Sequence, residues 1–383
     1  SLAAVSEVDM EFDIDFYLRQ YWQDERLSYQ HSEYNITVGM IGLTYEFSKE
    51  IWHPDTFFPN EKKAYIHSAT QTNEFLRLWS DGNILKSTRL TLTASCPMNL
   101  QYFPMDQQIC MVEVGSYGFS KKDLEYIWKD GEKPVRMGFN ADTLPQFTVF
   151  GHREKNRTSM TSTGNYSILI CEFLLVRSLN YYLIQFYIPA ALVVVISWFS
   201  LWMGREAAAE RMALGVTTVL TITTLLLSTN ANSPKISYVK AIDIYLGICF
   251  TMVFASLLQS ASIGYMAKRI NAAESKKDQI EDKKQAWKHE QAEELEKKAA
   301  EGGNEEVVNP FQLITVGFKK DRVIDKELEQ AAAKLRQSKF GLAFIDVISR
   351  ITFPLGFFLF NVGYWSYYLS ASTIADVDSW ATS

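Results

Sequence analysis

Four long apolar blocks constrain this chain more than any other feature of its sequence. They cover roughly residues 181–203, 207–228, 238–266 and 340–369. Each block is close to the ~20 residues that a helix needs to cross the hydrocarbon core of a bilayer. One such block could be a buried helix of a soluble protein, but four in one chain predict four membrane-spanning helices. We therefore expect a multi-pass membrane protein.

Residues 1–177 follow a different pattern. Short runs such as Phe12–Phe16 and Leu90–Ala94 alternate apolar and polar residues, and turn signals such as Ser80–Asn83 separate them. No long helical pattern intervenes to make crossovers, which favours an antiparallel two-sheet packing. The expected fold class is an extracellular all-β sandwich followed by an all-α transmembrane domain of four helices.

Four cysteines indicate the compartment of the sandwich. Cys96 and Cys110 lie in the polar half, Cys171 precedes the first span, and Cys249 lies inside the third. Only the first two look paired, and closing a loop of about 15 residues would contribute about 3 kcal/mol in the chain-entropy model. Two free buried thiols are the alternative. A persistent disulfide would place this half outside the cell.

Glycosylation sequons and basic residues predict the same orientation. The three Asn-x-Ser/Thr sequons all precede the first span, at Asn35, Asn156 and Asn165. Lysines and arginines cluster after the third span, at residues 268–269 and 276–284, which predicts a cytoplasmic loop there. Both termini of a plasma-membrane protein would then be extracellular.

The expected domain organisation follows from these patterns. The loop between the third and fourth spans is rich in Glu, Lys, Gln and Ala over 272–300, which suits a solvated helix, and a second helical stretch covers 325–339. The expected parts are an extracellular sandwich at 1–177, three spans in 178–268, a partly helical cytoplasmic loop at 269–339, a fourth span at 340–369 and an extracellular tail at 370–383.

The second apolar block carries hydroxyl and small residues at helical spacing. Every third or fourth position belongs to this stripe: Ala213, Thr217, Leu220, Thr224 and Leu227. The stripe could line a water-filled pore. A helix interface that uses threonines as hydrogen-bonding partners is an equal alternative on spacing alone.

Glu210 lies three residues before Ala213 and therefore on the face of the stripe. An acidic residue beside a membrane is costly unless it faces water or a partner. Repeated around a symmetric axis, Glu210 would form a ring of carboxylates that attracts cations. Arg211 points about 100° away and is expected to anchor to headgroups. Ordinary helix-end charges are the alternative for both residues.

The segment Cys96-Pro-Met-Asn-Leu-Gln-Tyr-Phe-Pro-Met-Asp-Gln-Gln-Ile-Cys110 resembles the signature of the Cys-loop pentameric receptors. Further matching segments are Trp52-His-Pro-Asp55, Tyr187-Ile-Pro189 and Leu214–Thr221. Within the family, Tyr238-Val-Lys-Ala-Ile-Asp243 and Asp24–Tyr29 are similar to the GABA- and glycine-receptor branch. The resemblance covers nearly the whole chain except the cytoplasmic loop.

The resemblance implies a pentameric ligand-gated channel, with four further subunits of the same or another kind and a small-molecule agonist bound between neighbours. It assigns the stripe to the pore, with Leu220 as a hydrophobic gate. The elements that would couple the sandwich to the pore are the Cys96–Cys110 loop, Arg177, Pro234, Lys235 and Lys240. Other expected partners are membrane lipids and permeant ions, without nucleic acid, cofactor or metal. No catalytic constellation occurs, so an enzyme is not expected.

The selectivity segment departs from the anion-selective relatives. They resemble Ala-Ala-Pro-Ala-Arg, whereas this chain has Ala207-Ala208-Ala209-Glu210-Arg211. Cation-selective branches of the family place a glutamate at the position of Glu210. With Ala209 in place of the proline, we expect a cation channel, a pattern that resembles invertebrate members. An anion channel is the alternative.

The resemblance also implies an agonist pocket with two faces. Aromatic rings attract a cationic amine, and an arginine can hold a carboxylate, so the pocket suits GABA or glycine. Two departures are Gly115, where many relatives carry a glutamate, and Thr161 in place of an aromatic residue; an unusual amine or a proton is therefore an alternative agonist. The principal face comprises Phe57, Tyr117, Phe119, Thr163 and Tyr166, and the complementary face comprises Tyr17, Arg19 and Ser87.

Overall fold

The computed structural model describes residues 1–29, 38–129, 134–138, 144–204, 207–231, 234–300, 310–372 and 380–382. The chain forms two compact units. The first, here the β unit, comprises Ser1–Ile184, Ser228–Ile244 and Trp365–Ser383. The second, here the helical unit, comprises Gln185–Leu227 and Tyr245–Tyr364.

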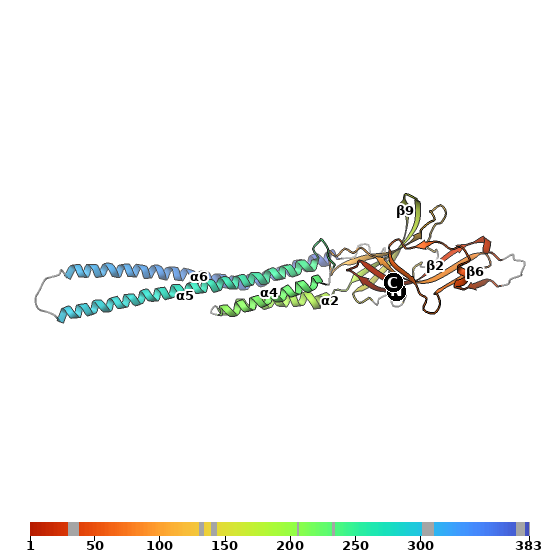
Figure 1. Ribbon diagram of the computed structural model, residues 1–383. Coiled ribbons are helices and arrows are strands. Elements are labelled where there is room, and N and C mark those ends of the chain that lie inside the picture. Colours follow the sequence, from red (N-terminus) through yellow and green to blue (C-terminus); the bar gives the residue numbers. More distant parts are fainter. Residues whose placement is uncertain are drawn as a thin grey trace. The chain divides into compact units, whose positions relative to one another are not determined.

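One sheet of the β unit contains the strand pair that bears the complementary face. Its order is β1-β2-β7-β6-β3, and β5 also pairs with β7. Figure 1 labels β2 and β6 of this sheet. All pairings in it are antiparallel. The strands are β1 (Leu2–Ser6), β2 (Glu11–Gln23), β3 (Met40–Leu43), β5 (Glu61–Ile66), β6 (Glu74–Trp79) and β7 (Asn83–Ser95), with short helical turns η1 (Glu25–Leu27) and α1 (Tyr45–Ser48).

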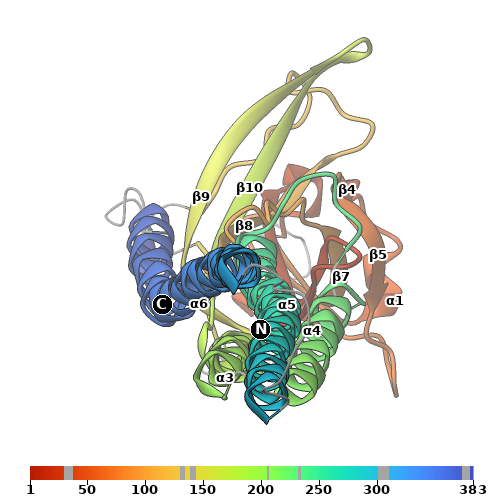
Figure 2. The same ribbon diagram turned by 90° about the vertical axis from the view of Figure 1, so that its left-hand side faces the viewer.

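The other sheet contains the strands of the principal face, in the order β11-β9-β10-β8-β4. Its longest pairing joins β9 to β10, which project from the sandwich as a hairpin (Figure 2). The strands are β4 (Thr56–Phe57), β8 (Gln107–Ser116), β9 (Phe147–Thr161), β10 (Gly164–Arg177) and β11 (Ala381–Thr382).

Alternating side chains of the two sheets form the core between them. Phe12 on β2 meets Phe173 on β10 edge to face, with ring centroids 6.5 Å apart. Leu92 and Leu175 are fully buried beside them. Cys96 and Cys110 form the expected disulfide. The prediction of an antiparallel all-β sandwich is confirmed.

The helical segments begin with a distorted first span. The α-helical turn α2 (Asn180–Tyr182) leads into a π-helical stretch η2 (Leu183–Tyr187) and then α3 (Ile188–Trp202). Pro189 stands in the first turn of α3. Because a proline has no N–H to donate and crowds the preceding turn, a locally widened helix is its common accommodation.

In the part of the chain that the structure describes, four helical segments are long and apolar enough to cross a membrane, as the four blocks predict. The spans after the first belong to α4 (Ala208–Ala231), α5 (Ala241–Ala300) and α6 (Pro310–Ala371). Helices α5 and α6 do not stop at the ends of their apolar blocks: the expected loop helices are direct continuations of the spans (Figure 1). Between these two helices the sequence has Gly302-Gly303-Asn304, which is typical of a helix interruption, and this segment lies outside the described residues.

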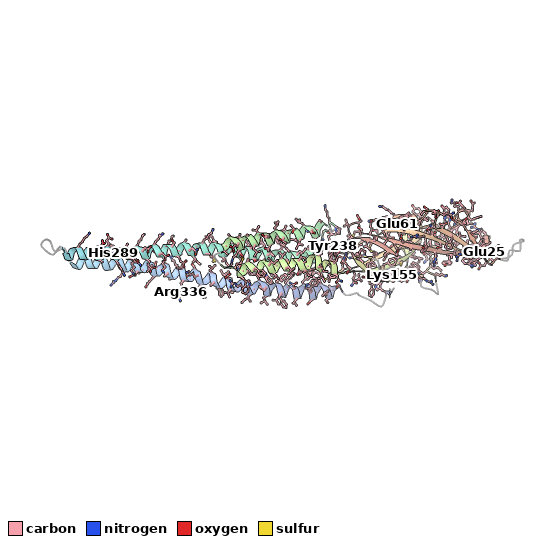
Figure 3. The ribbon with its side chains drawn as sticks, turned by 90° about the horizontal axis from the view of Figure 1, so that it is seen from below. Glu25, Glu61, Lys155, Tyr238, His289 and Arg336 are labelled. Atoms are coloured by element: carbon pink, nitrogen blue, oxygen red, sulfur yellow. A yellow bond between two sulfur atoms is a disulfide. The ribbon has the colours of Figure 1, made fainter. Side chains whose placement is uncertain are left out.

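Charged side chains decorate the extended parts of α5 and α6, where Figure 3 marks His289 and Arg336. Lys277 and Glu281 are paired one turn apart on α5, and Lys284 of α5 is paired with Asp325 of α6. An i,i+4 pair such as that of Lys277 and Glu281 supports a solvated helix by a few tenths of a kcal/mol. This is the charge pattern on which the helical expectation for 272–300 rested.

Candidate functional site

The loop that follows β8 presents two aromatic residues of the principal face, and Asp55 fixes its course. The Asp55 carboxylate accepts from the Ser116 hydroxyl at 2.5 Å and from the backbone N–H of Gly118 at 2.6 Å. The Ser116 hydroxyl in turn accepts from the N–H of Phe119 at 2.8 Å. Asp55 ends the Trp52–Asp55 segment, so the motif carried a positioning residue that the sequence reasoning did not assign to the pocket.

Aromatic contacts join the other principal residues to this loop. The rings of Phe57 and Tyr117 meet at right angles, with centroids 5.4 Å apart. Tyr117 is 77% exposed and Phe119 is 38% exposed, so both rings retain open faces. Ring faces that are accessible to solvent are the ones that a cationic group can use.

The tip of the β9–β10 hairpin lies against the same loop. The N–H of Lys121 donates to the carbonyl of Asn165 at 2.7 Å. At the tip, the hydroxyl groups of Thr163 and Tyr166 lie 2.9 Å apart, and Thr161 lies 3.0 Å from Thr163. The structure therefore brings the predicted principal residues onto one side of the second sheet, and Thr161 contributes a hydroxyl where an aromatic residue was expected.

A side chain at Gly115 would have to displace the end of the Ile168 side chain. A Cβ atom at this position would lie 2.4 Å from Cδ1 of Ile168 and 3.1 Å from the backbone oxygen of Ser167. Ile168 on β10 fills the space beside its strand partner on β8.

The complementary residues lie on the other sheet. Tyr17 and Arg19 are exposed on β2, and Ser87 is their neighbour on β7, directly opposite Arg19 in the register. Ser87 is only 4% exposed, so Arg19 and Tyr17 are the accessible members of this face. Within the described residues, no hydrogen bond or ring contact links them to the principal set. That the two sets form one pocket between neighbouring chains stays a prediction of the family resemblance.

Arg177 is the centre of a buried charged cluster at the end of β10. Its Nε donates to Asp106 Oδ1 at 2.7 Å and its Nη2 to Oδ2 at 3.2 Å. Glu7 and the Tyr182 hydroxyl also accept from Nη1. Burial opposes the charge, but the bonds to Asp106 and the nearby acidic groups outweigh it and raise the pKa of Arg177. The guanidinium therefore keeps its charge at all pH values of interest.

Aromatic rings enclose the same guanidinium. Its central carbon lies 4.4 Å from the ring centroid of Phe147 and 4.6 Å from that of Phe103. Phe103 and Asp106 both belong to the disulfide-closed loop, in the aromatic-Pro-x-Asp core of the motif. This core places an acceptor and a ring around one arginine.

The segment before α5 contacts the disulfide loop as well. The N–H groups of Ala241 and Ile242 donate to the carbonyls of Gln101 and Phe103 at 3.0 and 3.2 Å. The Tyr238 hydroxyl accepts from the N–H of Leu100 at 2.9 Å. Lys240, one of the predicted coupling residues, is buried, with its Nζ 3.8 Å from Asp243 Oδ2 and 6.0 Å from the Phe103 ring.

Pro234 and Lys235 stand earlier in this segment, where Pro234 is half-buried and Lys235 is exposed. The structure therefore places Arg177, Lys240 and the disulfide loop in one cluster, while Lys235 has no described contact with it. This cluster is named here the junction: Phe103, Asp106, Arg177 and Lys240.

The stripe of the second span lies on one exposed face of α4. Ala213, Thr217, Leu220, Thr224 and Leu227 are all exposed in the isolated chain. The buried residues of α4, among them Gly215, Thr218 and Ile222, alternate with them at helical spacing and face the other helices. Thr217 and Thr224 donate to carbonyls of their own helix, at 2.8 and 2.7 Å. Their hydroxyls are thus satisfied within α4 itself.

Glu210 and Ala209 are exposed in the first turn of α4, whereas Arg211 is not where the sequence predicted it. Arg211 is only 1% exposed, its Nη1 lies 3.8 Å from Asp346 Oδ1, and its Nη2 donates to the Met203 carbonyl. Asp346 also accepts from Arg350 at 2.9 Å. The expected headgroup anchor is therefore wrong: buried acceptors on α6 and at the end of the first span hold this arginine inside the bundle.

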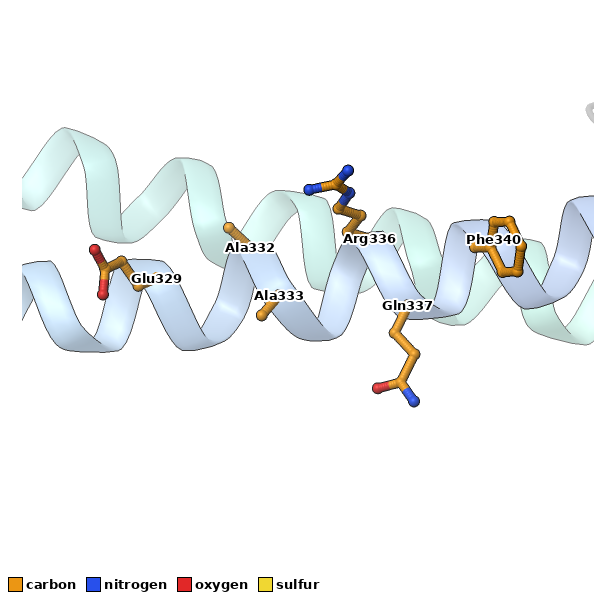
Figure 4. A pocket seen from close by; sticks show the side chains of 6 residues that line it. All are labelled: Glu329, Ala332, Ala333, Arg336, Gln337 and Phe340. Atoms are coloured by element: carbon orange, nitrogen blue, oxygen red, sulfur yellow. The ribbon is translucent and has the colours of Figure 1, made fainter.

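Two further features carry no assignment. Among the described residues, no group of three or more His, Cys, Asp or Glu side chains could hold a metal ion. A pocket on α6 is shown in Figure 4, and its lining comes from one helix face, without polar groups that converge on a ligand. Its residues are Glu329, Ala332, Ala333, Arg336, Gln337 and Phe340.

The described residues combine an antiparallel β-sandwich, a disulfide-closed loop and four helices that are long and apolar enough to cross a membrane. This architecture is that of a membrane receptor subunit. The family model described as the neurotransmitter-gated ion-channel ligand binding domain matches residues 1–183, and the model described as the neurotransmitter-gated ion-channel transmembrane region matches residues 186–309. The chain belongs to this family of ligand-gated ion channels, which are not enzymes, and the resemblance to Cys-loop receptors is confirmed.

Three relatives illustrate the similarity. A "Glutamate-gated chloride channel" of Drosophila melanogaster is 35% identical over 96% of this chain and 83% of its own length. A "Gamma-aminobutyric acid receptor subunit beta-like" of the same organism and a "Gamma-aminobutyric acid receptor subunit beta" of Caenorhabditis elegans are each 43% identical over 69% of this chain, which spans 54% and 47% of their lengths. None of these similarities supports the expected cation selectivity.

Proposed function

We propose that this chain is a subunit of an anion-selective channel that opens when an amino acid binds between neighbouring subunits. The observation that carries the proposal is the similarity, over nearly the whole chain, to a relative named a glutamate-gated chloride channel. The assembly has four further subunits in a plasma membrane, with both chain ends outside, and lipids surround the spans.

The proposed agonist has a carboxylate and an amine. Arg19 is exposed on the complementary face and offers the fork of donors that holds a carboxylate bidentately. The ring faces of Phe57, Tyr117 and Phe119 suit the amine. Glutamate and GABA, the agonists in the relatives' names, both have these two groups, and glycine has them in a smaller molecule.

Arg19 supplies the test of the agonist site. Arg19→Ala is expected to raise the half-maximal concentration of the active amino acid by at least tenfold, because the carboxylate loses its charged partner. Arg26→Ala is the matched control, since Arg26 is exposed and pairs locally with Asp24 at 2.7 Å. Equal potency in wild type and Arg19→Ala would exclude carboxylate binding at this position.

Cation selectivity is a second candidate, and Glu210 carries it. The carboxylate is exposed in the first turn of α4, one turn before Ala213, while Arg211 is buried and does not add a positive charge on that face. Five such carboxylates around an axis would attract cations and repel anions. Ala209, in place of a proline, belongs to the same departure.

Reversal potentials distinguish the two candidates. The chain is expressed alone, glutamate, GABA, glycine and external acid are applied in turn, and the reversal potential is followed after replacement of chloride and then of sodium. An anion channel follows chloride, and a cation channel follows sodium. The paired substitution Ala209→Pro with Glu210→Ala tests the determinant: in a cation channel it shifts permeability toward chloride, and Glu281→Gln on the exposed part of α5 is the charge-matched control.

The remaining assignments extend this proposal. Leu220 forms the gate in a pore lined by Ala213, Thr217, Thr224 and Leu227, and the junction, with Pro234 and Lys235, transmits binding to it. Asn156 and Asn165 are exposed and available for glycans, whereas Asn35 lies outside the described residues. The domain limits proposed are those of the sequence patterns: 1–177, 178–268, 269–339, 340–369 and 370–383.

A further inference from the structure

The outer edge of β9 is partly paired with residues 381–382. Strand β9 is the last long strand of its sheet, and an uncovered edge of this kind offers unpaired N–H and C=O groups to another strand. Strand β11 takes that place near the base of β9. Its two residues pair in antiparallel register, Ala381 with His152 and Thr382 with Gly151.

Trp380 anchors this short strand. Its side chain is only 6% exposed, and the central carbon of the Arg153 guanidinium lies 4.2 Å from the centroid of its ring system. A two-residue strand makes few hydrogen bonds with its neighbour. The buried Trp380 ring, packed on the Arg153 guanidinium, therefore adds stabilising contact that the short strand could not supply by itself.

Arg153 is itself held in place by neighbouring charges. It donates to Glu172 on β10, and Lys155, which Figure 3 labels, donates to the other oxygen of that carboxylate at 2.9 Å. Burial alone would raise the pKa of Glu172, but these two bonds outweigh it and lower the pKa. The guanidinium is therefore a fixed platform for the Trp380 ring, and the platform joins the two strands of the hairpin.

The other end of the tail is attached to the disulfide loop. The Gln107 side-chain amide donates to the carbonyl of Ser372, just after α6. The rings of Tyr102 and Tyr368 meet edge to face with centroids 6.2 Å apart. The end of the fourth span thus contacts the disulfide loop, and Trp380 contacts β9.

We propose that residues 380–382 are the chain's own partner strand for the edge of β9, and that this contact restrains the hairpin whose tip carries Thr163 and Tyr166. The two strands of the hairpin are paired from Arg177 opposite Phe147 to Gly164 opposite Thr161, with one irregularity near Leu174. Because the pairing is nearly continuous, the hairpin moves as one unit. A strand fixed at the base limits the motion of the tip. The proposal depends on the ligand-gated class of the channel and not on its ion selectivity.

A disulfide trap tests the docking without any agonist. His152→Cys with Ala381→Cys places cysteines at directly opposed positions of the register, where cross-strand Cβ atoms are about 4.5–5.5 Å apart. The expected result is an oxidant-dependent disulfide within one chain, read as loss of maleimide labelling that a reductant restores. His152→Cys with Thr382→Cys, one residue out of register, is the matched control and should cross-link at least tenfold more slowly.

The native thiols interfere little with this experiment. Burial raises the pKa of the Cys171 thiol to about 12, so it is neither a nucleophile nor readily labelled. Cys249 is also buried, and Cys96 and Cys110 are already joined. Absence of the in-register disulfide, equal rates for both pairs, or a bond that links two chains would overturn docking on the chain's own β9.

The restraint on the hairpin is tested with Trp380→Ala, and Trp380→Phe is the conservative control. Because a looser hairpin must be ordered on binding, Trp380→Ala is expected to raise the half-maximal concentration of GABA or glutamate at least threefold, and Trp380→Phe less than twofold. An unchanged or lowered value in Trp380→Ala would refute the restraint. If neither compound opens the channel, Trp380→Ala is added to the variant with His152→Cys and Ala381→Cys. Cross-linking that is at least threefold slower supports Trp380 as the anchor of the strand, and an unchanged rate refutes it.

Discussion

The buried pair of Arg177 and Asp106 offers a sharp quantitative prediction. The Arg177 side chain is fully buried and that of Asp106 is 2% exposed, and two hydrogen bonds join them. Removal of one partner of a buried pair leaves an uncompensated charge, which costs about 3–5 kcal/mol. Asp106→Asn and Arg177→Gln should therefore each destabilise the β unit by about this amount.

A double-mutant cycle separates the pair from its surroundings. In Asp106→Asn with Arg177→Gln neither charge remains, so the loss should be smaller than the sum of the single losses by at least about 2 kcal/mol. Because Glu7 and the rings of Phe103 and Phe147 stay in place, recovery is expected to be partial. For a domain of this size about 1 kcal/mol corresponds to roughly 2–4 °C, so each single variant should lose roughly 6–20 °C.

The assay is the thermal unfolding of the detergent-solubilised receptor, followed by size-exclusion fluorescence, with surface expression measured in parallel. Lys121 and Glu125 supply the control pair: their charged atoms are 3.0 Å apart, but both side chains are substantially exposed. Such pairs contribute less than about 1 kcal/mol, so Glu125→Gln should shift the midpoint by only a few degrees. Losses of Asp106→Asn and Arg177→Gln that add within about 0.5 kcal/mol would refute the coupling of this pair.

Three other outcomes follow from the same structure. Leu220→Thr should produce agonist-independent current, because a pore constriction lined by hydroxyl groups stays hydrated. Leu214→Thr, on the less exposed side of α4, should not produce such current. Patch recordings of the leak current test both variants. Tyr117→Ala should weaken the agonist by about 0.5–2 kcal/mol, or roughly 2- to 30-fold in concentration–response curves, whereas Tyr117→Phe should retain most potency. The pKa of Glu172 is lowered in the folded protein, so its ionised carboxylate stabilises the fold above about pH 4.3, and this stabilisation is lost as the pH falls through the lowered pKa. The difference in melting temperature between wild type and Glu172→Gln should therefore shrink on acidification. A constant difference down to pH 3 would contradict this prediction.

Local patterns in the sequence predicted much of the fold, because burial imposes them directly. Alternation along β2 and β7 follows from one face packing on the core, as Phe12 and Leu92 do. The four spans follow from the length of apolar helix that a bilayer requires. The disulfide was predictable because Cys96 and Cys110 are close in sequence.

Contacts between distant segments were not predictable in this way. Asp55 and Ser116 are 61 positions apart, and nothing in the spacing of either indicates that they jointly fix the loop of Tyr117. The failure for Arg211 has the same origin. A cation at a membrane interface has two low-energy environments, the headgroups and a buried acceptor, and only the position of Asp346 on α6 selects the second.

The burial of Arg211 leaves Glu210 as the exposed charged side chain at the start of α4. If Arg211 lay on the exposed face of α4, its charge would offset that of Glu210, and the pore entrance would be nearly neutral. Asp346 and the Met203 carbonyl instead hold it inside the bundle, so each subunit presents one net negative side chain at Glu210. In the pentamer proposed above, five such charges around a pore narrower than the ~8 Å screening length at physiological salt would act together on a passing ion. An anion channel would therefore have to place this ring where the pore is wide, and Glu210→Gln should then increase chloride current while the reversal potential still follows chloride. In a cation channel the same substitution removes the attraction itself and moves the reversal potential toward that of chloride, so a single variant gives opposite signatures for the two candidates.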